Sequence, residues 1–236
     1  MIKLDHVVYF TKKTPFETVS EQKAMDWHSV VGGHHEEWGT HNALMYLKNA
    51  YIEWLSVEHQ DVAEMSNHQL VELLLQDIDT GENWGSVCFS VNGIDSFNEK
   101  IRAIGFETSG VMDAERKTVT GDVRKWKMLF INQQPSDNLP LPFFIEWEEA
   151  DDVRFNKLRE DGTMLHDNEM LEITECIFSV SDPRKEAAEW AKLFSLEVKG
   201  GTIINLQNVT LKFIEKVEEN VKERLSEVVI EHTGMV

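Results

Sequence analysis

One short pattern occurs three times along this chain, and the repetition limits the possible folds more than any other feature. The copies are "YIEWLSVE" at 51–58, "FFIEWEE" at 143–149 and "LKFIEKV" at 211–217. Each places an acidic residue inside an apolar run typical of a buried strand, where an unpaired charge is costly. The three acids are Glu53, Glu146 and Glu215. We therefore expect a repeated structural unit whose last strand carries a carboxylate with a specific role.

A second recurring pattern precedes each of these strands. A short apolar strand passes through a polar turn into an amphipathic helix, and the copies begin at His6, Ser86 and Glu175. Apolar residues recur with helical spacing after the turn, and Asp95 and Asp182 are the expected helix caps. A glycine-marked turn and two or three further strands then follow each helix. The order predicts βαβββ units.

The chain is therefore interpreted as an α+β protein made of tandem βαβββ modules. The predicted modules span 1–60, 83–150 and, in shortened βαβ form, 169–236. A helix over 61–77 and a polar connection over 151–168 are expected to link them. The run "LSEVVIEH" at 225–232 resembles the opening strand of the chain and fits a closing strand.

Composition excludes several classes of partner. The 236 residues are 42% hydrophobic and carry a formal net charge of −19. Nucleic acids and anionic membranes need a basic surface, so neither is an expected partner. The chain has no 18-residue apolar run and no signal-peptide pattern at its start. Cys88 and Cys176 lie in apolar runs and are interpreted as buried thiols. A cytoplasmic protein is the expectation.

Two polar clusters suggest binding roles without fixing them. The histidine-rich stretch "GGHHEEWGTHN" at 32–42 lacks the second histidine of a zincin helix, and its glycines favour a strand and turn. Its histidines are either surface residues or, for His35 and His41, residues at a pocket rim. The basic segment 115–127 either presents Arg116 or Arg124 to an anionic substrate or forms a solvated hairpin.

The order of these motifs carries a family resemblance. The matching residues are "LDHVVY" at 4–9, "GTHNAL" at 39–44, "YIEW" at 51–54, Arg116, Gly121, Trp126, "LPFFIEW" at 141–147, His166 and Asn168. The chain resembles the glyoxalase-like domain family of the vicinal-oxygen-chelate superfamily, which also contains extradiol dioxygenases and antibiotic-resistance binding proteins. The resemblance covers about 1–170 directly and reaches 171–236 only through the internal repeat.

The resemblance implies an architecture and a site. Two modules within 1–150 pair edge to edge, and their curved sheets form a cupped half-barrel that holds the ligand. The positions of the superfamily metal ligands correspond to His6 and Glu53 in the first module and to Ser86 and Glu146 in the second. Because serine is a poor ligand, the expected metal set is His6, Glu53 and Glu146. Zn²⁺, Ni²⁺, Mn²⁺ and Fe²⁺ are all chemically admissible there.

Two functions are compatible with these residues. In the first, a metal-dependent lyase, isomerase or dioxygenase acts on a small oxygen-bearing metabolite, with Glu53 and Glu146 as catalytic carboxylates. The expected substrate-binding residues are Trp38, Asn42, Arg116 and Trp126. In the second, the carboxylates pair with neighbouring side chains, and a metal-free protein sequesters a small molecule among Trp38, Trp54, Trp126 and Trp147. The third module is expected to be structural or to form a homodimer.

Overall fold

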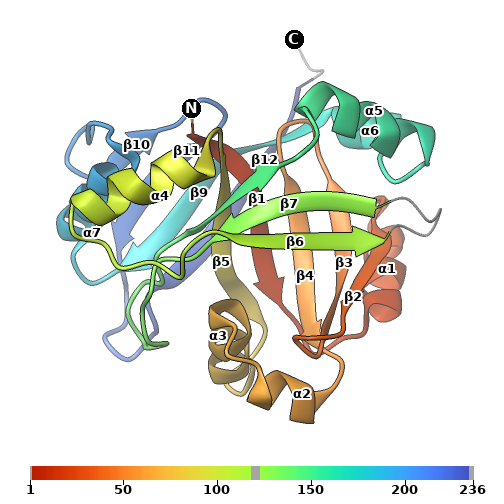
Figure 1. The fold of residues 1–236 in the computed structure, drawn as a ribbon, viewed down its shortest axis with the longest axis horizontal. Coiled ribbons are helices and arrows are strands. Elements are labelled where there is room, and N and C mark those ends of the chain that lie inside the picture. The colour runs from red at the N-terminus through yellow and green to blue at the C-terminus, as the bar shows by residue number, and fades with distance from the viewer. Residues whose placement is uncertain (1, 118–122, 234–236) are drawn as a thin grey trace.

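The computed structural model describes residues 2–117 and 123–233, with the side chains of residues 116 and 117 also outside the description. Its largest element is a curled eight-stranded sheet with the order β2-β3-β4-β1-β5-β8-β7-β6 (Figure 1). The strands are β1 (Ile2–Phe10), β2 (Val30–His35), β3 (Thr40–Tyr46), β4 (Tyr51–Val57), β5 (Asn83–Val91), β6 (Met112–Lys117), β7 (Val123–Leu129) and β8 (Phe143–Trp147). No helix in the described residues is long and apolar enough to cross a membrane.

The sheet consists of two βαβββ modules, as the repeat predicts. The first module inserts α1 (Pro15–Ala24) between β1 and β2, and the second inserts α4 (Ile94–Ala103) between β5 and β6. Within each module the first and last strands are parallel, β1 beside β4 and β5 beside β8. The antiparallel pair β1–β5 joins the modules at the centre of the sheet. The two halves therefore face one common concave side, which is the cup.

One of the two helix caps expected from the sequence is present, and a third cap was not predicted. Thr14 begins α1 with a capping box in which Glu17 also takes part. Asp182 caps α7 (Pro183–Phe194), as expected, by accepting a hydrogen bond from the Lys185 N–H at 3.0 Å. The prediction of Asp95 as a cap is wrong, because α4 begins after Gly93, which has no side chain to offer. The first N–H groups of α4 are instead bound by a distant carboxylate, described below.

A third, shortened module forms a separate four-stranded sheet with the order β10-β11-β9-β12. Its elements are β9 (Leu171–Val180), α7, β10 (Ile203–Asn205), β11 (Thr210–Glu215) and β12 (Arg224–His232). The closing strand β12 lies antiparallel to β9, in the same way that β5 lies antiparallel to β1. The likeness of 225–232 to the opening strand therefore has a structural reason: β12 occupies the place that the opening strand of a further module would take.

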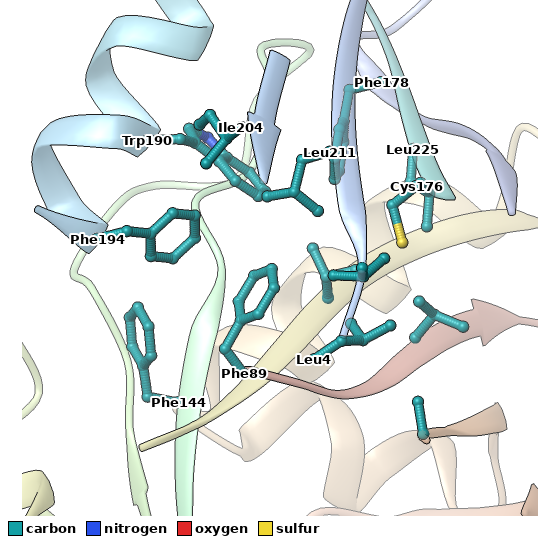
Figure 2. Close-up of a cluster of buried hydrophobic side chains, with 14 of the residues drawn as sticks. Leu4, Phe89, Phe144, Cys176, Phe178, Trp190, Phe194, Ile204, Leu211 and Leu225 are labelled. Atoms are coloured by element: carbon teal, nitrogen blue, oxygen red, sulfur yellow. The ribbon is translucent and has the colours of Figure 1, made fainter. Parts of the chain in front are cut away.

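The third module packs on the convex side of the large sheet. Phe194 of α7 lies 4.9 Å from Phe89 of β5 and 6.4 Å from Phe144 of β8, measured between ring centroids. Trp190 is fully buried in the same apolar cluster, which Figure 2 shows between the two sheets. Aromatic side chains bury large areas and dominate core energetics. This shared core fixes the third module to the first two.

The connections are more helical than the sequence indicated. The predicted helix over 61–77 is two helices, α2 (Gln60–Met65) and α3 (Gln69–Ile78), and the segment 151–168 contains α5 (Asp151–Glu160) and most of the short α6 (His166–Glu169). Figure 1 shows α2 and α3 together at one end of the large sheet. The break between them places His68 at the N-cap of α3, where its side chain lines the cup.

Candidate functional site

The cup is a narrow cavity between the two paired modules. Its volume is about 60 Å³, which is room for several water-sized groups. The first module and the loop before α3 contribute most of its polar residues, and the second contributes chiefly apolar and aromatic ones. The lining residues are His6, His35, Trp38, Thr40, Asn42, Leu44, Tyr46, Tyr51, Glu53, Leu55, His68, Leu70, Val71, Trp126, Met128, Phe143, Ile145 and Trp147.

His6 is held at the floor of the cup by a carboxylate that the sequence did not single out. A register shift in β1 between Leu4 and His6 brings the Asp5 carboxylate to within 2.8 Å of Nδ1 of His6. The Trp147 indole N–H donates to the other Asp5 oxygen at 2.8 Å. Burial raises the pKa of Asp5, but these hydrogen bonds and the Arg154 guanidinium outweigh it and hold the pKa below its ordinary value.

This contact fixes the tautomer of His6. An ionised carboxylate only accepts hydrogen bonds, so Nδ1 of His6 carries a proton and donates it to Asp5. In the neutral ring, Nε2 then presents a lone pair to the cup, and this is the arrangement found in histidines that bind metals. Stacking on Tyr51, with 4.4 Å between ring centroids, keeps the ring in place.

Glu53 is positioned as the repeat and the family resemblance together suggested, inside the cup and 8% exposed. The Asn42 side-chain amide donates to Glu53 Oε1 at 2.5 Å, and Asn42 Oδ1 in turn accepts from the Gly33 N–H at 2.8 Å. Gly32 makes room for this amide, because a Cβ there would lie 1.9 Å from Asn42 Oδ1. Oε1 is thereby occupied, and Oε2 lies 3.5 Å from Nε2 of His6.

His6 and Glu53 fit two positions around a divalent cation. Two ligands bonded to one ion at about 2.1 Å lie roughly 3.0–3.4 Å apart in octahedral or tetrahedral geometry, close to the 3.5 Å between Nε2 and Oε2. Asp5 and Cys88 are also near His6, all with ligand atoms within 4.8 Å of one another. Burial, with the Asp5 and Glu53 charges, raises the pKa of Cys88 well above its ordinary value, so the thiol stays protonated.

Glu146 does not join this group, which corrects the expected three-residue metal set. Its carboxylate accepts hydrogen bonds from the backbone N–H groups of Gly93 and Ile94 at the start of α4. Side chains alternate across a strand, and Ile145 and Trp147 line the cup, so Glu146 points away from it. The alignment on the Ile-Glu pair is correct in sequence but places the two acids on opposite faces. Ser86 is buried on β5 and does not line the cup.

The predicted substrate-binding residues divide into three groups. Trp38, Asn42 and Trp126 line the cup. Arg116 belongs to β6, but its side chain lies outside the described residues. Trp54, which the binding-protein alternative included, is buried in the core on the convex side of the sheet and does not line the cup.

His68 is a cup residue that sequence reasoning missed. It is 9% exposed, and neither ring nitrogen has a hydrogen-bond partner among the described residues. Trp38 covers it at 4.1 Å and Phe130 meets it edge-on at 5.0 Å, between ring centroids. Burial, with a smaller contribution from His35, lowers its pKa to about 4. His68 is therefore a neutral imidazole that offers one donor and one acceptor to a ligand.

An outer groove of about 1110 Å³ opens beside the cup and shares Trp38, Trp126 and Trp147 with it. Most of its charged lining residues in the described chain are acidic. The acids are Glu36, Glu37, Asp113, Glu115, Glu146 and Glu148, and the bases are Lys125 and Lys127. A groove with this excess of negative charge disfavours an anionic ligand.

Comparison with known proteins agrees with this fold. Residues 4–194 match the model of the glyoxalase-like domain family. No curated protein sequence matches the chain. Among solved structures, a hypothetical protein from Staphylococcus aureus is 22% identical and superposes with a TM-score of 0.82, covering 100% of this chain and 93% of its own. A Streptomyces coelicolor methylmalonyl-CoA epimerase is 16% identical, with a TM-score of 0.44 over 62% of this chain and 98% of its own. Because the family model spans most of its length and the paired modules form the cupped sheet, the chain belongs to the glyoxalase-like domain family.

Proposed function

We propose that the protein is a glyoxalase-like isomerase or lyase that moves a proton beside the carbonyl of a small, uncharged molecule. The observation that carries this proposal is the state of Glu53. One carboxylate oxygen is fixed by Asn42, and the other faces the cup beside His6. A buried carboxylate with one oxygen facing the ligand cavity is suited to act as a general base.

The proposed step balances without any further reactant. Glu53 Oε2 removes a proton from the carbon next to the carbonyl, and the electrons of that C–H bond form an enolate. In an α-hydroxy carbonyl compound the hydroxyl proton passes to the former carbonyl oxygen, and the protonated Glu53 returns its proton to the former carbonyl carbon, which yields the isomer. The His6 ring, oriented by Asp5, places Nε2 3.5 Å from Oε2. The N–H of neutral His68, on the loop before α3, is available to the ligand oxygen.

A divalent cation would compete with this role of Glu53, because it would bind the same Oε2 that removes the proton. His6 and Glu53 would hold it, with Zn²⁺, Ni²⁺, Mn²⁺ or Fe²⁺ acceptable to one imidazole and one carboxylate. When bound, it supplies Lewis-acid polarisation of the substrate oxygen. A dioxygenase is less well supported, because non-haem iron oxygenases use two histidines and one carboxylate. Within the described residues, no second histidine groups with His6 at metal-ligand spacing.

The second candidate is a metal-free binding protein, favoured by the aromatic mouth of the cup. Trp126 and Trp147 lie 5.3 Å apart, and Trp38 faces the same outer groove. Such rings would hold an amphipathic molecule whose head group enters the cup. In this case Glu53 and His68 would bind the head group without moving a proton.

An isomerisation assay separates the two. Neutral α-hydroxy ketones and aldehydes are incubated with the wild type, Glu53→Gln and Glu146→Gln, each with and without added Mn²⁺ or Zn²⁺, and products are followed by NMR. We expect conversion by the wild type and by Glu146→Gln, with loss of at least a hundredfold in Glu53→Gln. Saturable binding without conversion by any variant would favour the binding protein. Equal conversion by Glu53→Gln would remove Glu53 from the reaction.

A further inference from the structure

A second group of metal-ligand side chains lies outside the cup, at the hairpin of β2 and β3. His34 and His41 are cross-strand neighbours, and Glu58 directly follows β4. We call these three residues the rim cluster. Glu58 Oε1 lies 2.8 Å from His34 Nδ1 and 3.9 Å from His41 Nδ1. One ligand atom from each residue lies within 4.8 Å of the others.

The donor set suits a cation of intermediate softness. Imidazole nitrogens and a carboxylate together are a common ligand set for Zn²⁺ and Ni²⁺. Two ligands of one such ion are roughly 3.0–3.4 Å apart when each bond is about 2.1 Å. The distances of 2.8 Å and 3.9 Å lie on either side of this range. Small side-chain rotations therefore suffice, and His34 is free to make them because its side chain is 65% exposed.

The protonation states also favour a cation. Partial burial lowers the pKa of His41; Glu58 opposes this shift, and His34 and His59 add to it. Burial raises the pKa of Glu58, but the hydrogen bond from His34 and the nearby histidines hold it below its ordinary value. At neutral pH, His41 therefore offers a lone pair and Glu58 a negative charge.

The backbone around the rim cluster is already fixed. The N–H groups of Glu58 and His59 both donate to the Gly39 carbonyl, at 2.8 Å and 3.0 Å. Gly39 has φ = +63°, and a Cβ at this position would lie 2.5 Å from the His59 carbonyl oxygen. These hydrogen bonds and the close packing at Gly39 therefore fix the turn that ends at Gly39 against the start of α2. Ligands on prearranged backbone lose little entropy when an ion binds.

We propose that the rim cluster binds one Zn²⁺ or Ni²⁺ ion, distinct from any ion in the cup. The ion cross-links β2, β3 and the junction between β4 and α2. This junction holds the turn that carries Trp38, whose ring covers His68 at the mouth of the cup. Occupancy of the rim cluster thereby stabilises the position of Trp38 over His68. The inference is independent of the reaction proposed for Glu53.

Zinc binding by matched variants tests this inference. Five proteins are dialysed against micromolar ZnCl₂, and their metal content is measured. They are the wild type, His41→Gln, His34→Gln, Glu53→Gln and the control His166→Gln, which alters an exposed histidine of α6. We expect His41→Gln and His34→Gln each to bind one ion fewer than the wild type and His166→Gln. Glu53→Gln, which alters only the cup, should retain the rim ion. Equal zinc content in the wild type and both rim variants would overturn the proposal.

Hydrogen exchange tests the link to the cup mouth. Zinc should slow amide exchange over residues 34–41 at least fivefold in the wild type and in Glu53→Gln, and should leave His41→Gln unchanged. A variant that fails to fold is identified by its circular dichroism, and His34→Gln then takes its place, because the His34 side chain is the more exposed of the two. Zinc binding without slower exchange over 34–41 would overturn the cross-linking role.

Discussion

Acidification should destabilise this protein through His68. The folded state holds this imidazole at a pKa of about 4, against 6.5 for an ordinary histidine. Between these values the unfolded chain binds more protons than the folded one, so stability falls as the pH falls. From pH 7 to pH 5 this single group should cost about 2 kcal/mol of unfolding free energy. The loss of unfolding free energy is nearly complete once the pH is below the pKa of His68 in the folded state.

Urea unfolding at pH 7, 6 and 5 measures this contribution, with tryptophan fluorescence as the signal. His68→Phe removes the titrating group and keeps a ring against Trp38 and Phe130. We expect its stability to fall by about 2 kcal/mol less than that of the wild type over this pH range. His166→Gln serves as the control and should follow the wild type. Parallel pH dependence in the wild type and His68→Phe would refute a buried, neutral His68.

Three further substitutions test the contacts around the site. Gly32→Ala should displace the Asn42 amide and cost about 1–3 kcal/mol in urea unfolding, and most of this loss should disappear when Asn42→Ala is added. Glu146→Gln should lower the unfolding free energy by about 1 kcal/mol because it weakens the cap of α4. The loss should be the same with and without Zn²⁺. A loss of stability seen only in the presence of Zn²⁺ would indicate that Glu146 is a metal ligand. Arg224→Met removes two hydrogen bonds from the buried Asp77, which keeps its ion pair with Lys222. It should cost about 1–3 kcal/mol, and no change in thermal melting would contradict this.

The internal repeat was enough to predict the βαβββ modules. The spacing of the Ile-Glu strands and the helices before them predicted the modules, the family resemblance implied their edge-to-edge pairing, and 225–232 proved to be a strand, β12. The faces of the strands were harder to predict. In "FFIEW" the three residues before Glu146 are all apolar and buried, so no alternation of polar and apolar residues shows which face meets the cup. Because side chains alternate along a strand, a shift of one residue moves an acid from the face that lines the cup to the opposite face of the sheet.

The polar residues that complete the site depend on irregularities that periodicity cannot show. Asp5 reaches His6 only because the register of β1 shifts between Leu4 and His6. His68 enters the cup because the helix expected over 61–77 breaks before Gln69. The Gly32–Gly33 pair was a visible signal, but its role appears only when Asn42 is seen bound to the Gly33 N–H. Such positions are set by tertiary contacts that a local pattern does not encode.

Deuterium incorporation from solvent tests the central role of Glu53 most directly, because it reports proton removal whatever the later fate of the molecule. A neutral α-hydroxy ketone such as hydroxyacetone is incubated in D₂O with the wild type, Glu53→Gln or Glu146→Gln, and loss of the proton signal beside the carbonyl is followed by NMR. The account predicts catalysed exchange by the wild type and Glu146→Gln, and only the uncatalysed rate with Glu53→Gln. Exchange by Glu53→Gln at the wild-type rate, or its loss in Glu146→Gln alone, would contradict the account.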